Sequence, residues 1–384
     1  MLTSKRAQFT LPRSVTYLNC AYMAPLMKTV EKAGIKGLRS KRNPVGIKPN
    51  DFYTDTETLR LEYAKLINTK EANRIVTIPS VSYGLATVAR NLHIKKEQHI
   101  IVAGEQFPSN YYPWQSLCEE TGASVKIISA PENFVDRGKR WNERILEAID
   151  SNTRAVAIAH FHWADGTRFD LQAIRQRTKE VGALLIVDGT QSVGAVPFDI
   201  QKIQPDALVC AGYKWLLGPY SIGLAYYGDY FNNGKPIEES WINRKDSEDF
   251  AGLVAYQRHY QLGMLRYEVG EHSNFILVPM MIKAIEQLNK WGVNRIQEYC
   301  QSITTESISR LRERGFIVED EGFRGSHLFG IRLPAGVDLK AVKTTLLKHK
   351  VYVSYRGNVI RVAPNVYNTE NDLQKLVRVM SSVL

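Results

Sequence analysis

From about residue 56, the chain alternates between helical spacing and short apolar runs. The apolar runs expected to be strands are 74–78, 99–103, 124–128, 155–159, 183–187, 207–210 and 222–226, and helical spacing is found at 56–67, 82–92, 109–120, 141–149 and 171–181. Regular strand–helix alternation is typical of a mostly parallel sheet with helices on both faces. We therefore expect an α/β fold whose large unit contains a mostly parallel sheet of seven strands.

The pattern changes after about residue 270. Two long helical stretches, 275–290 and 293–314, follow one another. Short strands near 328–332, 351–354 and 358–362 then surround helices at 338–348 and 369–381. The sequence therefore predicts a large domain, 15–265, followed by a smaller α+β domain, 266–384.

Composition supports a folded protein outside the membrane. With 384 residues and 44% hydrophobic residues, the chain can bury a substantial core. The first residues contain no apolar segment of signal length, and no uninterrupted apolar stretch approaches a membrane span. We expect a cytoplasmic protein without a membrane partner.

The formal charge of +11 raises the question of nucleic-acid binding. Basic residues are spread along the chain, and the densest cluster is Lys36, Arg39, Lys41, Arg42 and Lys48. This stretch contains glycine and proline and few aromatic residues. We interpret it as a solvated loop, or a loop near an anionic substrate, and expect no nucleic-acid partner.

The cysteines and histidines do not indicate a metal site. Cys20, Cys118, Cys210 and Cys300 form no C-x-x-C pair and no cluster with histidine, so we expect reduced, packed thiols. The histidines at 160 and 162 share one face of a strand, but no carboxylate or cysteine completes a ligand set with them. No metal is predicted.

Two residues at predicted strand ends carry the chemical argument. Lys214 follows the buried run 207–210, and Asp188 ends the run 183–187. Ligands of parallel α/β sheets bind at the carboxyl ends of the strands. A carboxylate that keeps a pyridine nitrogen protonated and an amine that forms a Schiff base are what pyridoxal 5'-phosphate requires. We therefore predict this cofactor, with Lys214 as the catalytic residue and Asp188 as a cofactor-binding residue.

The spacing of these residues matches a known family. Asp188, Gln191 three residues later and Gly-Tyr-Lys-Trp at 212–215 resemble the class V aminotransferase family of pyridoxal phosphate enzymes. The family includes aminotransferases, cysteine desulfurases, kynureninases and isopenicillin N epimerase-like enzymes, and the resemblance runs from about Tyr17 to Leu373. It implies fold type I, residues 1–14 joined to the small domain, and a homodimer with active sites at the subunit interface.

The resemblance assigns cofactor contacts to several strand ends. The segment 79–84 follows a strand and opens a helix, where free amides favour an anion. Val81 is expected to bind the phosphate through its backbone and Ser82 through its side chain. Phe107 is expected to stack on the cofactor ring, and Gln191 to contact the ring hydroxyl. Trp163 replaces an asparagine that is common in relatives and is expected to line the pocket.

Two further segments are assigned through the resemblance. The loop 266–274 is similar to one that reaches the phosphate of the neighbouring subunit; Glu271 replaces its usual threonine, and we expect Ser273 to bind instead. Arg361 lies in an Arg-x-Ala-Pro segment and is expected to bind the substrate α-carboxylate through two parallel hydrogen bonds. Tyr22 lies in a segment expected to line the substrate pocket.

We expect an enzyme that acts on an amino acid or a related amine. An aminotransferase is the first hypothesis, because amino-group transfer needs no residue beyond this set. The alternative is a lyase that cleaves a side chain, as in kynureninase or a cysteine/selenocysteine lyase. A persulfide-forming desulfurase is not expected, because the stretch 351–359 contains no cysteine. A non-catalytic regulator is disfavoured because Lys214 is present.

Overall fold

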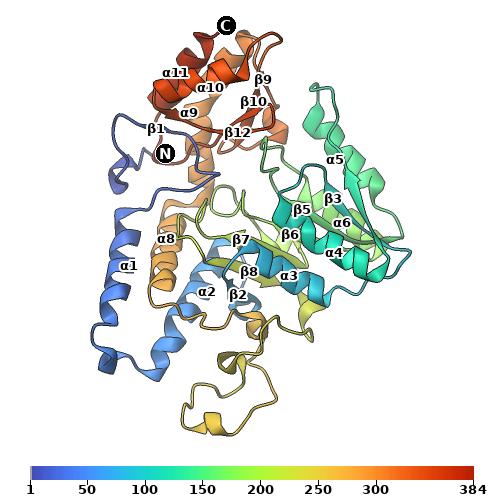
Figure 1. Cartoon of the computed structure of the whole chain (residues 1–384), viewed down its shortest axis with the longest axis vertical. Coiled ribbons are helices and arrows are strands. Elements are labelled where there is room, and N and C mark those ends of the chain that lie inside the picture. Colours follow the sequence, from blue (N-terminus) through green and yellow to red (C-terminus); the bar gives the residue numbers. More distant parts are fainter. Residues whose placement is uncertain (1) are drawn as a thin grey trace.

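A sheet of seven strands forms the centre of the protein, and the computed structural model describes residues 2–384 (Figure 1). The strands are β2 (Ile75–Ile78), β3 (His99–Ala103), β4 (Ser124–Ile128), β5 (Thr153–Ala159), β6 (Leu184–Asp188), β7 (Ala207–Ala211) and β8 (Gly223–Tyr227). Their order is β2-β8-β7-β6-β5-β3-β4, and β8 runs antiparallel to both of its neighbours. The predicted α/β fold with a mostly parallel sheet is confirmed.

Helices cover both faces of this sheet (Figure 1). They are α2 (Thr54–Leu66), α3 (Val81–Asn91), α4 (Tyr112–Thr121), α5 (Arg137–Ala148), α6 (Leu171–Val181) and the short α7 (Ile200–Ile203). Alternate residues of β3 enter different apolar clusters: Ile100 and Val102 pack with α3 and α4, whereas Ile101 packs in the cluster that includes α5 and α6. Two covered faces explain why the strands read as continuous apolar runs.

A second sheet lies in the C-terminal part of the chain. Its strands are β9 (Ile317–Val318), β10 (Phe329–Arg332), β12 (Ser354–Arg356) and β13 (Val359–Val362), all antiparallel, in the order β12-β13-β10-β9. The helices of this part are α9 (Val293–Glu313), α10 (Leu339–Lys348) and α11 (Glu370–Ser381). The predicted domain borders at 15–265 and 266–384 stay a prediction.

The N-terminal residues pack on this C-terminal part (Figure 1). Strand β1 (Thr16–Tyr17) pairs in parallel with β11 (Val351–Tyr352), and the amide of Lys5 donates to the carbonyl of Val366 at 2.7 Å. Contacts of the described N-terminal residues thus join them to the C-terminal part; that residues 1–14 belong to a small domain stays a prediction.

Helix α1 (Lys28–Ser40) corrects one expectation from the sequence. It lies beside α8 (Leu277–Trp291) in Figure 1, so part of the basic cluster is helical rather than a loop. Glycines permit this approach: a Cβ on Gly37 would lie 2.1 Å from the carbonyl oxygen of Phe275. Lys36 and Arg39 occupy the exposed side of the helix. The glycines that suggested a loop instead serve helix packing.

Candidate active site

A cavity of about 290 Å³ lies at the carboxyl ends of the central strands. Seven of the predicted site residues line it: Val81, Ser82, Phe107, Trp163, Asp188, Gln191 and Lys214. They lie at or just after the ends of β2, β3, β5, β6 and β7. Ser273, Arg361 and Tyr22 are not part of its lining. The sheet thus gathers into one wall residues that are far apart in the sequence.

Lys214 lies in the turn after β7 with its side chain buried. Its Nζ atom is 5.5 Å from the ring centre of Phe107 and 5.6 Å from that of Tyr213. Burial, together with the charge of Arg361, lowers the pKa of Lys214 to about 8, and the charge of Asp188 partly opposes this change. A lysine whose pKa is lowered in this way has a larger neutral fraction, which is the nucleophilic form.

Asp188 ends β6 and is buried. Its Oδ1 atom accepts a hydrogen bond of 2.9 Å from the amide of Thr190. Burial raises the pKa of Asp188, while the bonds from Thr190 and the charge of Lys214 counteract this rise. A buried carboxylate facing the cavity fits a group that carries a protonated ring nitrogen.

The amide of Gln191 is fixed against the cavity wall. Its Nε2 atom donates to the carbonyl of Ala21 at 3.2 Å, and its Oε1 atom accepts from Nε1 of Trp215 at 2.7 Å. The side chain therefore has one orientation, with the remaining N–H of the amide available at the cavity.

The first turn of α3 forms another side of the cavity. Ser80 caps the helix by accepting from the amide of Tyr83 at 3.2 Å, and its Oγ atom is 2.8 Å from that of Ser82. The amides of Val81 and Ser82 have no partner inside the helix because they belong to its first turn. Free amides, a hydroxyl and the positive end of the helix dipole fit a phosphate group.

Trp163 and Phe107 meet edge to face, with ring centres 5.4 Å apart and an interplanar angle of 78°. The indole Nε1 of Trp163 donates to the carbonyl of Glu105 at 2.7 Å. The polar atom of this side chain is therefore bonded to the main chain. Its ring supplies an apolar wall where relatives place a polar asparagine.

Arg361 lies on β13, next to the cavity but outside its lining, and is only 1% exposed. Its Nη1 atom donates to the carbonyl of Trp163 at 2.6 Å, and its Nη2 atom lies 3.4 Å from Oγ of Ser354. Burial, with the charge of Arg356, lowers the pKa of Arg361 to about 9. Tyr22 is 56% exposed. Its segment is held near Lys214, because the amide of Ala24 donates to the carbonyl of Tyr213, the residue before Lys214.

Ser273 is buried in a loop that lies outside the cavity of its own chain. Glu268 anchors this loop: its carboxylate is 2.9 Å from Nη1 of Arg60 and accepts a 3.0 Å bond from the amide of Thr77. Contact of Ser273 with a phosphate of the neighbouring subunit stays a prediction.

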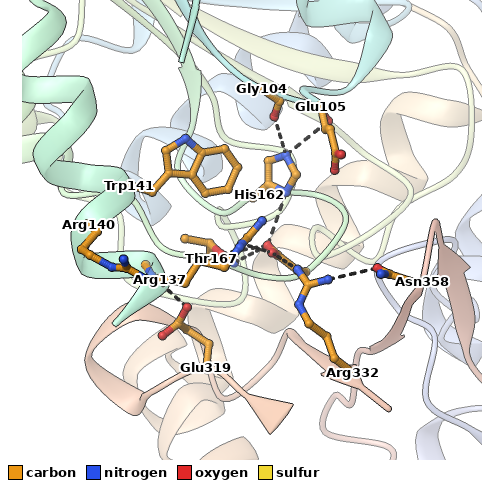
Figure 2. A network of polar contacts seen from close by, with 12 residues as sticks. Gly104, Glu105, Arg137, Arg140, Trp141, His162, Thr167, Glu319, Arg332 and Asn358 are labelled. Carbon is orange, nitrogen blue, oxygen red and sulfur yellow. Dashed lines mark hydrogen bonds and ion pairs between the residues drawn. The ribbon is translucent and has the colours of Figure 1, made fainter. Parts of the chain in front are cut away.

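A buried polar network fixes the loop that carries Trp163, and Figure 2 shows it. The carboxylate of Asp165 is 2.6 Å from Nη1 of Arg137 and 3.2 Å from Nη2 of Arg332, which belongs to β10 of the second sheet. The amide of Thr167 also donates to it at 3.1 Å. The network therefore ties the second sheet to the cavity wall.

His162 of this loop is held by main-chain carbonyls. His162 is buried, with Nε2 3.2 Å from the carbonyls of Gly104 and Glu105 (Figure 2). Burial lowers the pKa of His160 to about 3. Within residues 2–384, no three His, Cys, Asp or Glu side chains gather in a way that could hold a metal ion.

Gln106 and Arg356 are among the residues near the cavity that sequence reasoning missed. Gln106 lines it, with Nε2 donating to the carbonyls of Asn110 at 3.1 Å and Ala157 at 2.8 Å. Arg356 places its guanidinium carbon 5.0 Å from the ring centre of Trp163. No motif in the sequence marks Arg356, because its position depends on how the second sheet packs beside the first.

The fold and this site define a fold type I pyridoxal phosphate enzyme. The cysteine desulfurase CsdA from Escherichia coli superposes with a TM-score of 0.82 at 21% identity, covering 98% of this chain and 97% of that chain. A C-DES variant with glycine covalently linked to its pyridoxal phosphate superposes with a TM-score of 0.84 at 17% identity, covering 100% of both chains. At these identities the likeness shows the fold.

Sequence comparison gives the family. The model of the family described as Aminotransferase class-V matches residues 47–379, so the chain belongs to this family, whose members use pyridoxal phosphate. The aminotransferase YcbU of Bacillus subtilis, described as uncharacterized, is 28% identical over 326 residues, covering 84% of this chain and 82% of that protein. A cysteine desulfurase of Shigella sonnei is 26% identical over 258 residues, covering 66% of this chain and 61% of that protein.

The predicted family and cofactor are thereby confirmed, and the protein is a pyridoxal phosphate-dependent enzyme. No helix within residues 2–384 has the length and apolar character needed to cross a membrane.

Proposed function

We propose that this protein is an aminotransferase that takes the amino group from an amino acid or a related amine. The observation that carries the proposal is the position of Lys214, whose pKa is lowered to about 8, in a cavity that it shares with Asp188 and Phe107. The aminotransferase YcbU, which aligns over most of the chain, supports the same reaction class.

The residues in and beside the cavity would have different roles in such a reaction. Pyridoxal phosphate, when bound, supplies an electron sink for the substrate α-carbon. Lys214 would hold the cofactor, and its amine would move the proton at the substrate α-carbon. Asp188 keeps the ring nitrogen protonated, and Phe107 packs on the ring and excludes water. Arg361 orients the substrate by binding its carboxylate.

A lyase that cleaves a substrate side chain is the second candidate. It is supported by the likeness in fold to C-DES, described as a cystine C-S lyase, and by relatives described as cysteine desulfurases. The thiols of this chain oppose a persulfide-forming route. All four cysteines are free and buried, and burial raises the pKa of Cys20 to about 11. A buried thiol of this kind is a poor nucleophile.

A spectral screen of the purified holoenzyme against amino acids tests the proposal. A donor should convert the visible absorption of the lysine-bound cofactor to that of the aminated cofactor without any keto acid, and a keto acid should restore it. Release of a side-chain fragment together with alanine, or together with ammonia and a keto acid, with the original spectrum regained without an added keto acid, would instead establish the lyase.

We also propose a homodimer in which Ser273 contributes to the phosphate site of the other subunit. The proposal is supported by the anchored loop around Glu268, which places Ser273 outside the cavity of its own chain. Light scattering of the holoenzyme measures the assembly, and a monomer with full activity would refute it. The cytoplasmic location and the absence of a nucleic-acid partner stay predictions from the sequence.

A further inference from the structure

A second guanidinium group lies beside the cavity. Arg356 is the last residue of β12, and its guanidinium carbon is 5.0 Å from the ring centre of Trp163. Trp163 lines the cavity and meets Phe107 edge to face, and Phe107 is 5.5 Å from Nζ of Lys214. Arg356 is therefore separated from the reacting lysine by the two aromatic side chains of the cavity wall.

Strand pairing places Arg356 on the same side of the second sheet as Arg361. Ser354 is directly opposite Arg361 in the ladder between β12 and β13, so their side chains share a face. Arg356 is two residues after Ser354 and therefore points to that face as well. The two arginines are diagonal neighbours, a distance at which each can hold one end of a small molecule.

The turn that follows Arg356 is held in place. Arg332 donates from Nη1 to Oδ1 of Asn358 at 3.1 Å, and the same arginine binds Asp165, as Figure 2 shows. The hairpin is thereby fixed to the loop that carries Trp163. Arg356 lies outside the lining of the cavity, against Trp163 of its wall, and is carried by a braced element, as a binding residue requires.

The two arginines lack the carboxylate partners that neighbouring arginines have. The Nε atoms of Arg356 and Arg361 are both buried without a hydrogen-bond partner among the described residues. Their guanidinium groups donate to main-chain carbonyls, Nη1 of Arg356 to Tyr355 at 2.7 Å and Nη1 of Arg361 to Trp163 at 2.6 Å. Beside Lys214, the site thus carries an excess of positive charge that a bound anion would neutralise.

The α-carboxylate of an amino acid would bind one of the two guanidinium groups, that of Arg361, and would leave Arg356 without an anion. We propose that Arg356 binds a second anionic group of the substrate, so that the preferred substrate is an amino acid with an acidic side chain. The planar guanidinium can bind a carboxylate, a sulfonate or a phosphate ester through two parallel hydrogen bonds. This inference rests on the proposed action on an amino acid, and it specifies the substrate class of that same site.

The binding test uses the holoenzyme and calorimetry with non-reacting acids. Succinate and glutarate should bind more tightly than butyrate. Arg356→Gln should weaken the dicarboxylates about 30- to 100-fold, the lower part of the range for truncating one partner of a charge pair, because Arg356 is only partly buried. Binding of butyrate should be unchanged. Arg314→Gln, the same exchange at an exposed arginine, is the control and should change neither.

A spectral titration identifies the anion. Aspartate and glutamate carry a carboxylate, cysteate a sulfonate and phosphoserine a phosphate ester. Asparagine and glutamine are the uncharged counterparts of the two carboxylates. Acidic amino acids should perturb the cofactor spectrum at lower concentrations, with the advantage lost in Arg356→Gln. The variant should keep the circular dichroism spectrum and cofactor content of the wild type.

The outcomes separate the two proposals. Equal responses to acidic and neutral amino acids, or an equal loss of both in Arg356→Gln, would overturn the role of Arg356 and leave the aminotransferase proposal intact. Dicarboxylate binding that depends on Arg356, without a spectral response to any amino acid, would support the anion site and refute the aminotransferase proposal.

Discussion

Replacing Asp165 with asparagine should destabilise the protein by about 3–5 kcal/mol, the usual cost of breaking a buried ion pair by removing one partner. Asp165 is 7% exposed and bonds to Arg137 at 2.6 Å and to Arg332 at 3.2 Å. Asparagine keeps an acceptor for the amide of Thr167 but removes the negative charge between two arginines. The hydrogen bonds of Asp165 to the two arginines, at about 1.5–3 kcal/mol each, give a similar total loss of stability.

Asp150→Asn is a matched control. The side chain of Asp150 is 47% exposed and lies 3.4 Å from Nζ of Lys126. Exposed pairs of this kind contribute about 0–1 kcal/mol. Urea unfolding of both variants, each saturated with cofactor, should therefore show a much larger loss of stability for Asp165→Asn. Equal midpoints for the two variants would refute the reasoning.

The pH dependence gives a second check. Burial alone would raise the pKa of Asp165, but His162 and Arg137 hold it well below its usual value. A carboxyl whose folded pKa is depressed contributes its full stability above its unfolded pKa of about 3.9, and loses it as the pH falls below that value. The difference between wild type and Asp165→Asn should be constant from about pH 8 to pH 5 and narrow below about pH 4.

The remaining predictions concern the reaction. Lys214→Ala should abolish the borohydride-reducible link between chain and cofactor while the fold is kept, so a lysine-linked pyridoxyl adduct in this variant would show the assignment to be wrong. Arg361→Ala should raise the KM of a carboxylate substrate by a factor that corresponds to about 2–4 kcal/mol of binding free energy. The KM of the matching decarboxylated amine should hardly change, and equal changes for both substrates would contradict a carboxylate contact. Incubation with cysteine should leave no persulfide on the chain, since burial raises the pKa of Cys20 and of Cys118 to about 11; a mass gain of one sulfur on any thiol would favour the lyase.

Much of the fold could be read from the sequence because the sheet is covered on both faces. Buried parallel strands appear as uninterrupted apolar runs, and all seven expected strands are present in the structure. Residues at the carboxyl ends of those strands, such as Asp188 and Lys214, had to converge on one edge. Periodicity and chain order were sufficient for this part of the site.

The rest depends on packing that no periodicity encodes. Helix α1 was mistaken for part of a loop because its glycines resemble turn residues, whereas Gly34 and Gly37 permit contact with α8. Arg356 was missed because its place beside Trp163 follows from the position of one sheet relative to another. The hydrogen bond of the Trp163 indole to a main-chain carbonyl could not be deduced from a residue type either.

The antiparallel strand β8 also imposes an order on folding. The turn with Val81 and Ser82 follows β2, an edge strand whose sheet partner is β8, so that Ile75 pairs with Tyr226. During synthesis, β2 remains unpaired until β8 has emerged from the ribosome, and such long-range pairing forms slowly. The N-terminal segment finds its partner later still, because Asn19 forms a β-bridge with Ala363 near the end of the chain. The complete cofactor site is thus a late product of folding, and capture of pyridoxal phosphate by a nascent chain would report that nearly all of it has been made.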